Sequence, residues 1–269
     1  MKRALVLGAI FLAALASAMY LGLTPASLMP REGGLALLGR FFAAAFTPTL
    51  TSESDLANSI IPNLWQGTVN TVVFAVAAMS LSLIVGAILG VIASERWWQL
   101  FPRAGKLRPL LYGAARALIA FMRSIHELIW AVALLAAFGL NPASGVIAIT
   151  IPFGGTLAKV FSEMLDEAPE DAALALRYAG AGSRQVFLFG LLPRALPDMG
   201  AYAFYRFECA LRSAAILGFF GFSTLGKFIS ESVDELYFHE AWSYLYALLA
   251  LILIVEWWSG ALRQKLTIA

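Results

Sequence analysis

Charged side chains are scarce in this sequence: Asp, Glu, Lys and Arg make up only 13% of its 269 residues. Soluble domains contain about 25% of such residues, so the composition excludes an ordinary soluble protein. Cysteine occurs once, at Cys209, and histidine twice, which excludes an intrachain disulfide and a thiolate metal cluster. Hydrophobic residues make up 60% of the chain. We therefore expect a membrane protein whose partners are lipid and other proteins, with no nucleic acid and no metal site.

Long apolar runs are abundant instead. A helix needs about 20 apolar residues to cross the hydrocarbon core of a bilayer. Six runs are long enough: 4–23, 68–93, 111–138, 144–165, 199–221 and 241–259. None alternates like a barrel strand, and backbone groups in lipid must be paired within the protein. The sequence therefore predicts an all-α, polytopic membrane protein with six transmembrane helices.

Lysine and arginine indicate the orientation. With the termini and the connections 94–110 and 166–198 on one side, that side holds twelve of the 19 basic residues: Lys2, Arg3, Arg96, Arg103, Lys106, Arg108, Lys159, Arg177, Arg184, Arg194, Arg263 and Lys265. The opposite side holds Arg31, Arg40 and Lys227. Basic residues accumulate on the cytoplasmic side, so we expect both termini and the connection 166–198 to be cytoplasmic.

The first apolar run has two interpretations. Lys2 and Arg3, the apolar stretch and the small residues Ala16-Ser17-Ala18 are also typical of a secretory signal with its cleavage site. The length of the run favours a retained helix. Beyond it, the external connection 24–67 predicts a short surface helix, because its apolar residues fall on one helical face at Leu35, Leu38, Phe42 and Phe46. We divide the chain into residues 1–64 and a core of residues 65–269.

The connection between the fourth and fifth runs contains the stretch LALRYAGAGSRQVFLFGLLPRALP, residues 174–197. Two acidic residues favour a helix that starts beside them, and two glycines can end it: Glu170, Asp171, Gly180 and Gly182. Prolines at 193 and 197 are expected to end local structure before the fifth span begins. By residue types alone, this segment could be an ordinary connector.

The spacing of Gly180 and Leu192-Pro193 resembles the EAA loop of the permease subunits of ABC importers. In that family, the loop forms a coupling helix that docks into a groove of a cytoplasmic ATPase. The match is partial, because Leu174 stands where the family has its leading glutamate and Gly190 where it has an isoleucine. The resemblance implies that ATPase coupling involves Leu174, Arg177, Gly180, Ala181, Gly182, Leu192 and Pro193.

Three further blocks resemble phosphonate-type ABC permeases: MRSIHELIWAVALLAAFGLNPASGVIAI from Met122, GGTLAKVFSEML from Gly154 and YRFECALRSAAILGFFGFSTLGKFI from Tyr205. His126 stands where the family often has proline. The resemblance implies a type I importer-like permease of the bacterial inner membrane. Its partners would be a cytoplasmic ABC ATPase dimer, an external substrate-binding protein and a second permease copy. ATP and Mg²⁺ would be used by the ATPase, while this chain binds no cofactor and has no catalytic residues.

Charged residues inside the apolar runs are candidate pathway positions, because such side chains are costly in lipid and usually face a cavity or the bundle interior. They are Arg116, Arg123, Glu127, Arg206, Glu208, Arg212 and Glu256. The spacings Arg123–Glu127 and Glu208–Arg212 equally permit ion pairs that only fix helix packing. We take Arg116, Arg123, Ser124, Glu127, Arg206, Glu208, Arg212 and Ser213 as the candidate substrate pathway.

The resemblance also favours a substrate class. Phosphonate, phosphite and hypophosphite systems use similar permeases, so we expect a small phosphorus oxyanion. Arginine suits such an anion because its N–H donors form a fork. In this family the external binding protein supplies affinity, so a transient positive path through the permease would suffice.

Pro152, Gly154 and Gly155 weaken the helix of the fourth run. They can serve as a hinge for alternating access or allow close helix packing, since both residue types are frequent in membrane helices.

Two stretches imitate enzyme motifs. Gly221–Phe228 has the spacing of a phosphate-binding loop, but Phe228 replaces the Ser or Thr that binds Mg²⁺. His126 begins a stretch similar to a zinc-protease motif, but Trp130 occupies the second ligand position. The sequence therefore predicts no ATPase or metal centre in this chain.

The competing function is an ion-coupled secondary transporter that acts alone. Its coupling protons would be carried by Glu127, Glu208 and Glu256. Such transporters often contain inverted repeats with broken helices, and no repeat of this kind is visible in the sequence.

Overall fold

The structure is a computed structural model that describes residues 2–24, 29, 33–55, 57–101, 105 and 107–268, without the side chains of 2–4 and 265–268. The regular elements of these residues are helices. In addition, Thr51 and Ser59 form one isolated β-bridge. The predicted all-α fold is confirmed. Arg31, Arg103 and Lys106, which entered the charge count, lie outside the described residues. Contacts divide the chain into two compact units, Met1–Pro48 and Thr49–Ala269.

The first unit contains α1 (Lys2–Tyr20) and α2 (Gly34–Ala44). Nearly all described side chains of α1 are exposed, which fits a helix whose apolar surface faces lipid. The short helix predicted in the external connection is confirmed as α2, with Leu35, Leu38 and Phe42 exposed. Phe46 lies beyond the end of this helix.

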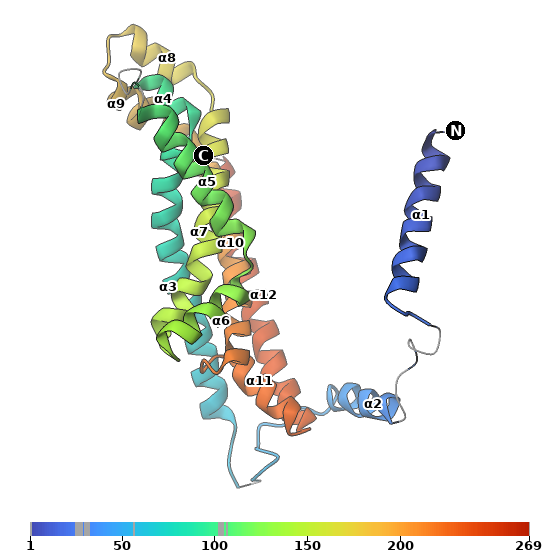
Figure 1. The fold of residues 1–269 in the computed structure, drawn as a ribbon. Coiled ribbons are helices and arrows are strands. Elements are labelled where there is room, and N and C mark those ends of the chain that lie inside the picture. The colour runs from blue at the N-terminus through green and yellow to red at the C-terminus, as the bar shows by residue number, and fades with distance from the viewer. Residues whose placement is uncertain are drawn as a thin grey trace. The chain divides into compact units, whose positions relative to one another are not determined.

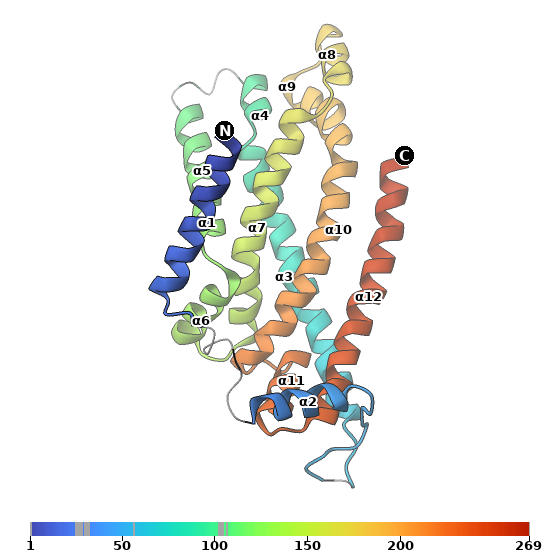
Figure 2. The ribbon, with the colours of Figure 1, turned by 90° about the vertical axis from the view of Figure 1, so that its right-hand side faces the viewer.

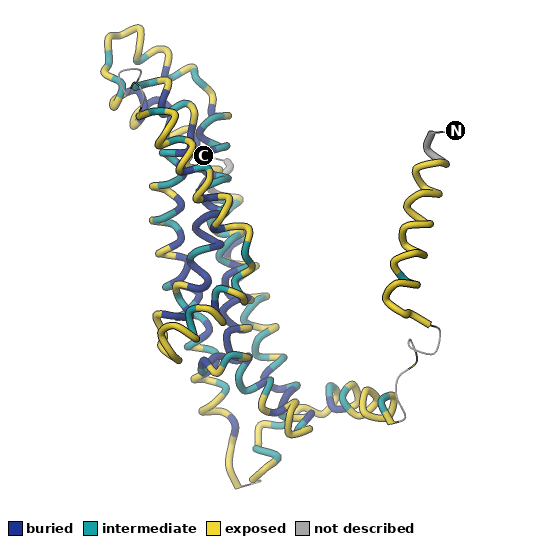
Figure 3. Tube along the Cα trace, in the orientation of Figure 1, coloured by how far each residue is buried: buried dark blue, intermediate teal, exposed yellow. Residues whose placement is uncertain are grey.

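The second unit is a bundle of long helices: α3 (Ile61–Ile92), α7 (Pro142–Glu167), α10 (Leu192–Ile216) and α12 (Phe238–Ile268). Figures 1 and 2 show them running side by side. Figure 3 shows the buried residues concentrated along α7. A Cβ added at Gly86 of α3 would lie 2.6 Å from Leu157 Cβ of α7. Small residues therefore let these two helices approach closely, as they do in other membrane helix pairs.

One predicted span is broken. The run 111–138 was expected to form one helix, and this is wrong: α5 (Leu107–Ser124) and α6 (Glu127–Phe138) meet at 90°. The break falls at His126, whose backbone is extended, with φ −68° and ψ 147°. The Leu128 N–H donates to His126 Nδ1 over 3.4 Å and so caps the first turn of α6.

The fifth span begins earlier than expected. Pro193 and Pro197 do not end local structure; α10 starts at Leu192, and Pro193 lies in its first turn. The helix is continuous with the preceding π-helical segment, Val186–Leu191, whose last hydrogen bond joins the Leu192 N–H to the Phe187 carbonyl. Pro193 therefore lies where the hydrogen-bond pattern changes from π to α, a place at which a missing N–H is tolerated. At the other end, α10 continues through the 3₁₀ segment η3 (Leu217–Phe220) to α11 (Leu225–Asp234), with a bend of 46°.

Three helices are long and apolar enough to cross a membrane by length and composition: Ile61–Ile92, Pro142–Glu167 and Phe238–Gln264. Counting each bent pair as one span gives up to five. The described side chains of α1 form a shorter apolar helix, Leu5–Tyr20. The number of six spans therefore stays a prediction, as does the division of the chain at residue 64.

The short helices lie at the two ends of the bundle. At one end, which we call the α8 end, are α4 (Glu95–Leu100), α8 (Asp171–Tyr178), α9 (Ser183–Gln185) and the π-helical segment η2 (Val186–Leu191) (Figures 1 and 2). Helices α6 and α11 lie toward the opposite end. Helix α12 ends on the side of the α8 end.

Candidate functional site

Helix α8 confirms the helix predicted from Glu170 onward. Asp171 in its first turn and Arg177 in its last turn both complement the helix dipole. The helix ends in a Schellman motif: the Gly180 N–H donates to the Arg177 carbonyl over 3.1 Å, and the Ala181 N–H donates to the Leu176 carbonyl over 3.0 Å. Gly180 has φ +83°, a left-handed conformation that favours glycine. Gly180 therefore ends α8, as predicted.

The segment after α8 folds back against it. The Gly182 N–H donates to Gln185 Oε1 over 3.0 Å, and η2 follows. A Cβ added at Gly190 of η2 would lie 2.7 Å from Ala173 Cα of α8, closer than real Cβ contacts. The contact between η2 and α8 therefore requires glycine at position 190.

The seven predicted coupling residues lie on α8, on its C-terminal turn and at the start of α10. Leu174, Arg177 and Pro193 are exposed, and Tyr178 is 87% exposed. Leu192 and Ala181 are half-buried. Residues 171–193, which we call the docking segment because ATPase docking is predicted there, thus present exposed apolar side chains and two exposed arginines, Arg177 and Arg184.

Midway along the bundle, α7 and α10 bring an arginine and an aromatic ring together. The guanidinium carbon of Arg206 lies 4.2 Å from the centre of the Phe153 ring, a cation–π contact. Arg206 Nε is buried and has no hydrogen-bond partner among the described residues. The side chain is therefore held in place by a ring that leaves its N–H donors available.

Arg123 reaches the same region from the end of α5. A Cβ added at Gly155 would lie 2.8 Å from Met122 Cβ and 3.1 Å from Arg123 Cγ, so glycine at this position permits the close approach of α5 to α7. Gly155 thus has a packing role; a hinge at Pro152 stays a prediction.

The two ion pairs considered within single helices do not form. Glu208, which is buried, accepts a hydrogen bond from Arg263 Nη2 of α12 over 3.0 Å, and Arg212 is exposed. Glu127 Oε1 accepts a hydrogen bond from Ser213 Oγ over 2.9 Å. The break at His126 separates Arg123 from Glu127, because the two residues lie on helices at 90° to each other.

The remaining candidates are also placed. Ser124 Oγ donates to the Phe121 carbonyl of its own helix over 2.8 Å. Arg116 Nη2 lies 3.8 Å from Asp166 Oδ2. Among the described residues, carboxylates thus lie within 4.0 Å of Arg116 and Arg263 but not of Arg123, Arg206 or Arg212.

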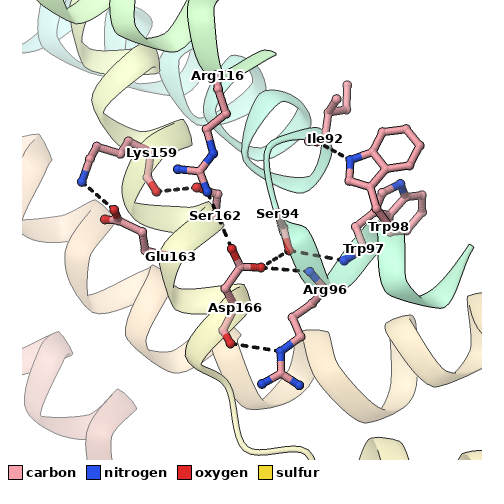
Figure 4. Close-up of polar contacts among 10 residues, drawn as sticks. All are labelled: Ile92, Ser94, Arg96, Trp97, Trp98, Arg116, Lys159, Ser162, Glu163 and Asp166. Atoms are coloured by element: carbon pink, nitrogen blue, oxygen red, sulfur yellow. Dashed lines mark hydrogen bonds and ion pairs between the residues drawn. The ribbon is translucent and has the colours of Figure 1, made fainter. Parts of the chain in front are cut away.

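Sequence analysis missed a polar cluster around Asp166, at the end of α7. Its partners lie on the turn before α4, on α4 itself and on α5 (Figure 4). Ser94 before Glu95-Arg96-Trp97 was a visible N-cap signal, and the Trp97 N–H indeed donates to Ser94 Oγ over 3.4 Å. The pairing with Asp166 joins residues about 70 positions apart, which local patterns do not reveal.

Metal binding has no support in the part of the chain that the structure describes. Within it, no group of three or more His, Cys, Asp or Glu residues could hold a metal ion.

The sequence model of the family described as "Binding-protein-dependent transport system inner membrane component" matches residues 103–268. The phosphite transport system permease protein PtxC of Stutzerimonas stutzeri is 28% identical over 246 residues, covering 86% of each chain. The phosphate-import permease protein PhnE of Mycolicibacterium smegmatis is 28% identical over 83% of this chain and 42% of its own length.

Solved structures show the same fold. A chain of the MetNI methionine ABC transporter in an inward-facing conformation matches with a TM-score of 0.66 at 19% identity, over 80% of this chain and 99% of that one. A chain of an amino acid ABC transporter matches with a TM-score of 0.64 at 17% identity, over 76% and 94% of the two chains.

Proposed function

Because the chain belongs to the family of binding-protein-dependent transport system inner membrane components, the membrane subunits of ABC importers, we propose that it carries a small phosphorus oxyanion. Phosphonate, phosphite and hypophosphite are the candidates. The phosphite permease of Stutzerimonas stutzeri, similar over 86% of the chain, supports this substrate class.

The observation that best supports the proposal is that several arginines of the bundle have no carboxylate nearby. Arg123, Arg206 and Arg212 lie in or beside the bundle without a carboxylate within 4.0 Å among the described residues. Placing one arginine at the centre of a bilayer costs about 2.5–3.5 kcal/mol even on the lowest scale, so such residues face a cavity or a partner. A passing oxyanion would pair with them, since a guanidinium presents several donors to its oxygens.

In ABC importers a separate subunit hydrolyses ATP, so the energy for transport would come from a partner of this chain. We propose that a cytoplasmic ATPase dimer, which uses ATP and Mg²⁺, binds the docking segment, and that an external binding protein delivers the anion. Two ATPases need two docking segments, which favours a homodimer of this permease. ATP binding and hydrolysis would then switch the bundle between outward and inward openings. In this arrangement the α8 end and both termini are cytoplasmic.

Two of the three glutamates that a secondary transporter would use for coupling protons have partners within the bundle. Glu208 is paired with Arg263, and Glu127 accepts a hydrogen bond from Ser213. The chain also belongs to a family of binding-protein-dependent transport components, whose energy comes from a partner subunit. Energy from a partner ATPase is the better explanation.

The substrate class is tested by ATPase stimulation. The chain would be purified with its cognate ATPase and binding protein, and ATP hydrolysis measured with phosphonate, phosphite, hypophosphite or methionine. We expect one of the phosphorus anions to raise the rate and methionine to leave it unchanged. Stimulation by methionine and by none of the three anions would contradict the proposal.

A further inference from the structure

Asp166 joins three segments of the chain at the α8 end (Figure 4). Its Oδ1 accepts hydrogen bonds from Ser94 Oγ over 2.6 Å and from the Arg96 backbone N–H over 3.1 Å. Its backbone carbonyl accepts one from Arg96 Nε, also over 3.1 Å. These contacts fix the start of α4 against the end of α7.

Two further contacts extend this group to α5 and to α8, the helix of the docking segment, which we call the docking helix. Arg96 Nη1 pairs with Glu170, the residue that precedes α8. Arg116 Nη2 of α5 lies 3.8 Å from Asp166 Oδ2. We call these five residues, Ser94, Arg96, Arg116, Asp166 and Glu170, the Asp166 cluster. It forms a continuous polar connection from the docking helix, through α4 and α7, to α5.

The far end of this connection reaches the proposed anion path. Arg116 and Arg123 lie seven residues apart on α5, about two turns along one face. Arg123 is one of the candidate pathway arginines that have no carboxylate within 4.0 Å among the described residues. A displacement of α8 that moves Glu170 would therefore act on Arg96, on Asp166 and finally on the helix that carries Arg123.

The sequence of α8 gives the cluster a specific role. Leu174 replaces the glutamate of the related loops, so α8 lacks that carboxylate. Glu170, one turn earlier, supplies a carboxylate, but this one pairs within the chain, with Arg96. Both Leu174 and Glu170 line the hollow between α4 and α8, together with Arg96 and Gln99.

We propose that Arg96 and Asp166 are positioning residues for ATP-driven transport, which transmit movement of the docking helix to α5. This inference rests on the proposed function. Ser94 is buried, but the four charged side chains of the cluster are only partly buried, with exposed fractions between 24% and 42%. Ion pairs this exposed contribute little to folding, so neutral variants should fold and report on coupling.

The test uses the complete transporter in proteoliposomes, with wild-type chain, Arg96→Gln, Asp166→Asn or both. The measured quantity is anion taken up per ATP hydrolysed, alongside the amount of ATPase that co-purifies. We expect each single variant to lower this ratio about fivefold or more, because typical coupling between two sites changes an equilibrium by at least about this factor. The amount of ATPase that co-purifies should be unchanged. The double variant should lose no more than the stronger single one, because the two residues act in one connection.

Lys159→Gln is the matched control. Lys159 Nζ pairs with Glu163 Oε1 over 2.6 Å on the same helix α7, and Glu163 lies about one turn before Asp166 (Figure 4). The variant should leave the ratio of anion to ATP unchanged. A wild-type ratio in Arg96→Gln and Asp166→Asn would overturn the inference. A fall matched by lost ATPase binding would overturn it too, because the role would then be structural. If the wild type itself showed no ATP-driven uptake, the proposed function would fail and this inference with it.

Discussion

At the scale of single residues, the sequence identifies the charged side chains of the bundle but not their partners. Glu208 pairs with Arg263, 55 positions away, and Arg116 with Asp166. Spacing along a helix favours Arg212 as the partner of Glu208, yet Arg263 of another helix pairs with it because the bundle packs the two together. Arg116 has no carboxylate four residues away, so spacing gave no indication of its partner. The structure thereby reduces the arginine candidates to Arg123, Arg206 and Arg212.

Arg206 provides the residue-level prediction. Arg206→Gln removes the charge while keeping a side chain that can contact Phe153. Hydrogen bonds to a charged group contribute about 1.5–3 kcal/mol, so we expect the rate of ATP-driven uptake to fall about tenfold or more. Assembly with the ATPase should persist. The measurement is initial uptake in proteoliposomes at equal protein content.

Two controls accompany Arg206→Gln. Arg40→Gln removes an exposed arginine of α2 and should transport as the wild type does. Arg206→Lys keeps the positive charge but lacks the planar fork of donors, so its uptake rate should lie between those of Arg206→Gln and the wild type. Uptake at the wild-type rate in Arg206→Gln would remove this residue from the pathway.

At the scale of elements, apolar content predicts that helices exist, but not where they break. The run 111–138 is apolar throughout, yet the extended backbone of His126 divides it into α5 and α6. Conversely, Pro193 suggests an ending but lies in the first turn of α10. Hydrophobicity measures the preference for lipid, whereas breaks depend on the backbone dihedrals of single residues and on local capping contacts.

The break gives an element-level prediction. His126 has φ −68°, the angle that a proline ring imposes, so His126→Pro should be tolerated: the gain from restricting the unfolded chain offsets the loss of the Nδ1 cap, and thermal stability should change little. Leu134→Pro, inside α6, should lower stability by about 3 kcal/mol. Melting temperatures of the two variants in detergent provide the comparison. A large loss of stability in His126→Pro would show that the bend is not fixed by this residue.

The contact between η2 and α8 gives a second prediction. Gly190→Ile introduces a Cβ where the neighbouring Ala173 Cα is only 2.7 Å away, so α8 must shift. We expect substrate-stimulated ATP hydrolysis to be lost although the chain still reaches the membrane. Gly260→Ile is the control, since a Cβ there meets nothing within 4 Å. Normal stimulation in Gly190→Ile would refute the assignment of residues 171–193 as the docking segment.

At the scale of the whole molecule, composition predicts the all-α membrane class, and the motif blocks predict the family to which the chain belongs. The number of spans is less predictable, because bent pairs and a short α1 give three to five by length and composition. The docking helix was also predictable, from Asp171 to Gly180, since its acidic start and glycine end are local signals. The Asp166 cluster was not, because it joins residues as far apart in the sequence as Ser94 and Asp166, 72 positions.

The central claim is that this chain moves a phosphorus oxyanion by energy from a partner ATPase. Its most direct test is uptake of labelled phosphonate, phosphite and hypophosphite by proteoliposomes, with each component omitted in turn. We predict uptake of at least one anion only when permease, ATPase, binding protein and ATP are all present. Uptake by the permease alone, driven by an ion gradient without ATP, would contradict this account and establish a secondary transporter.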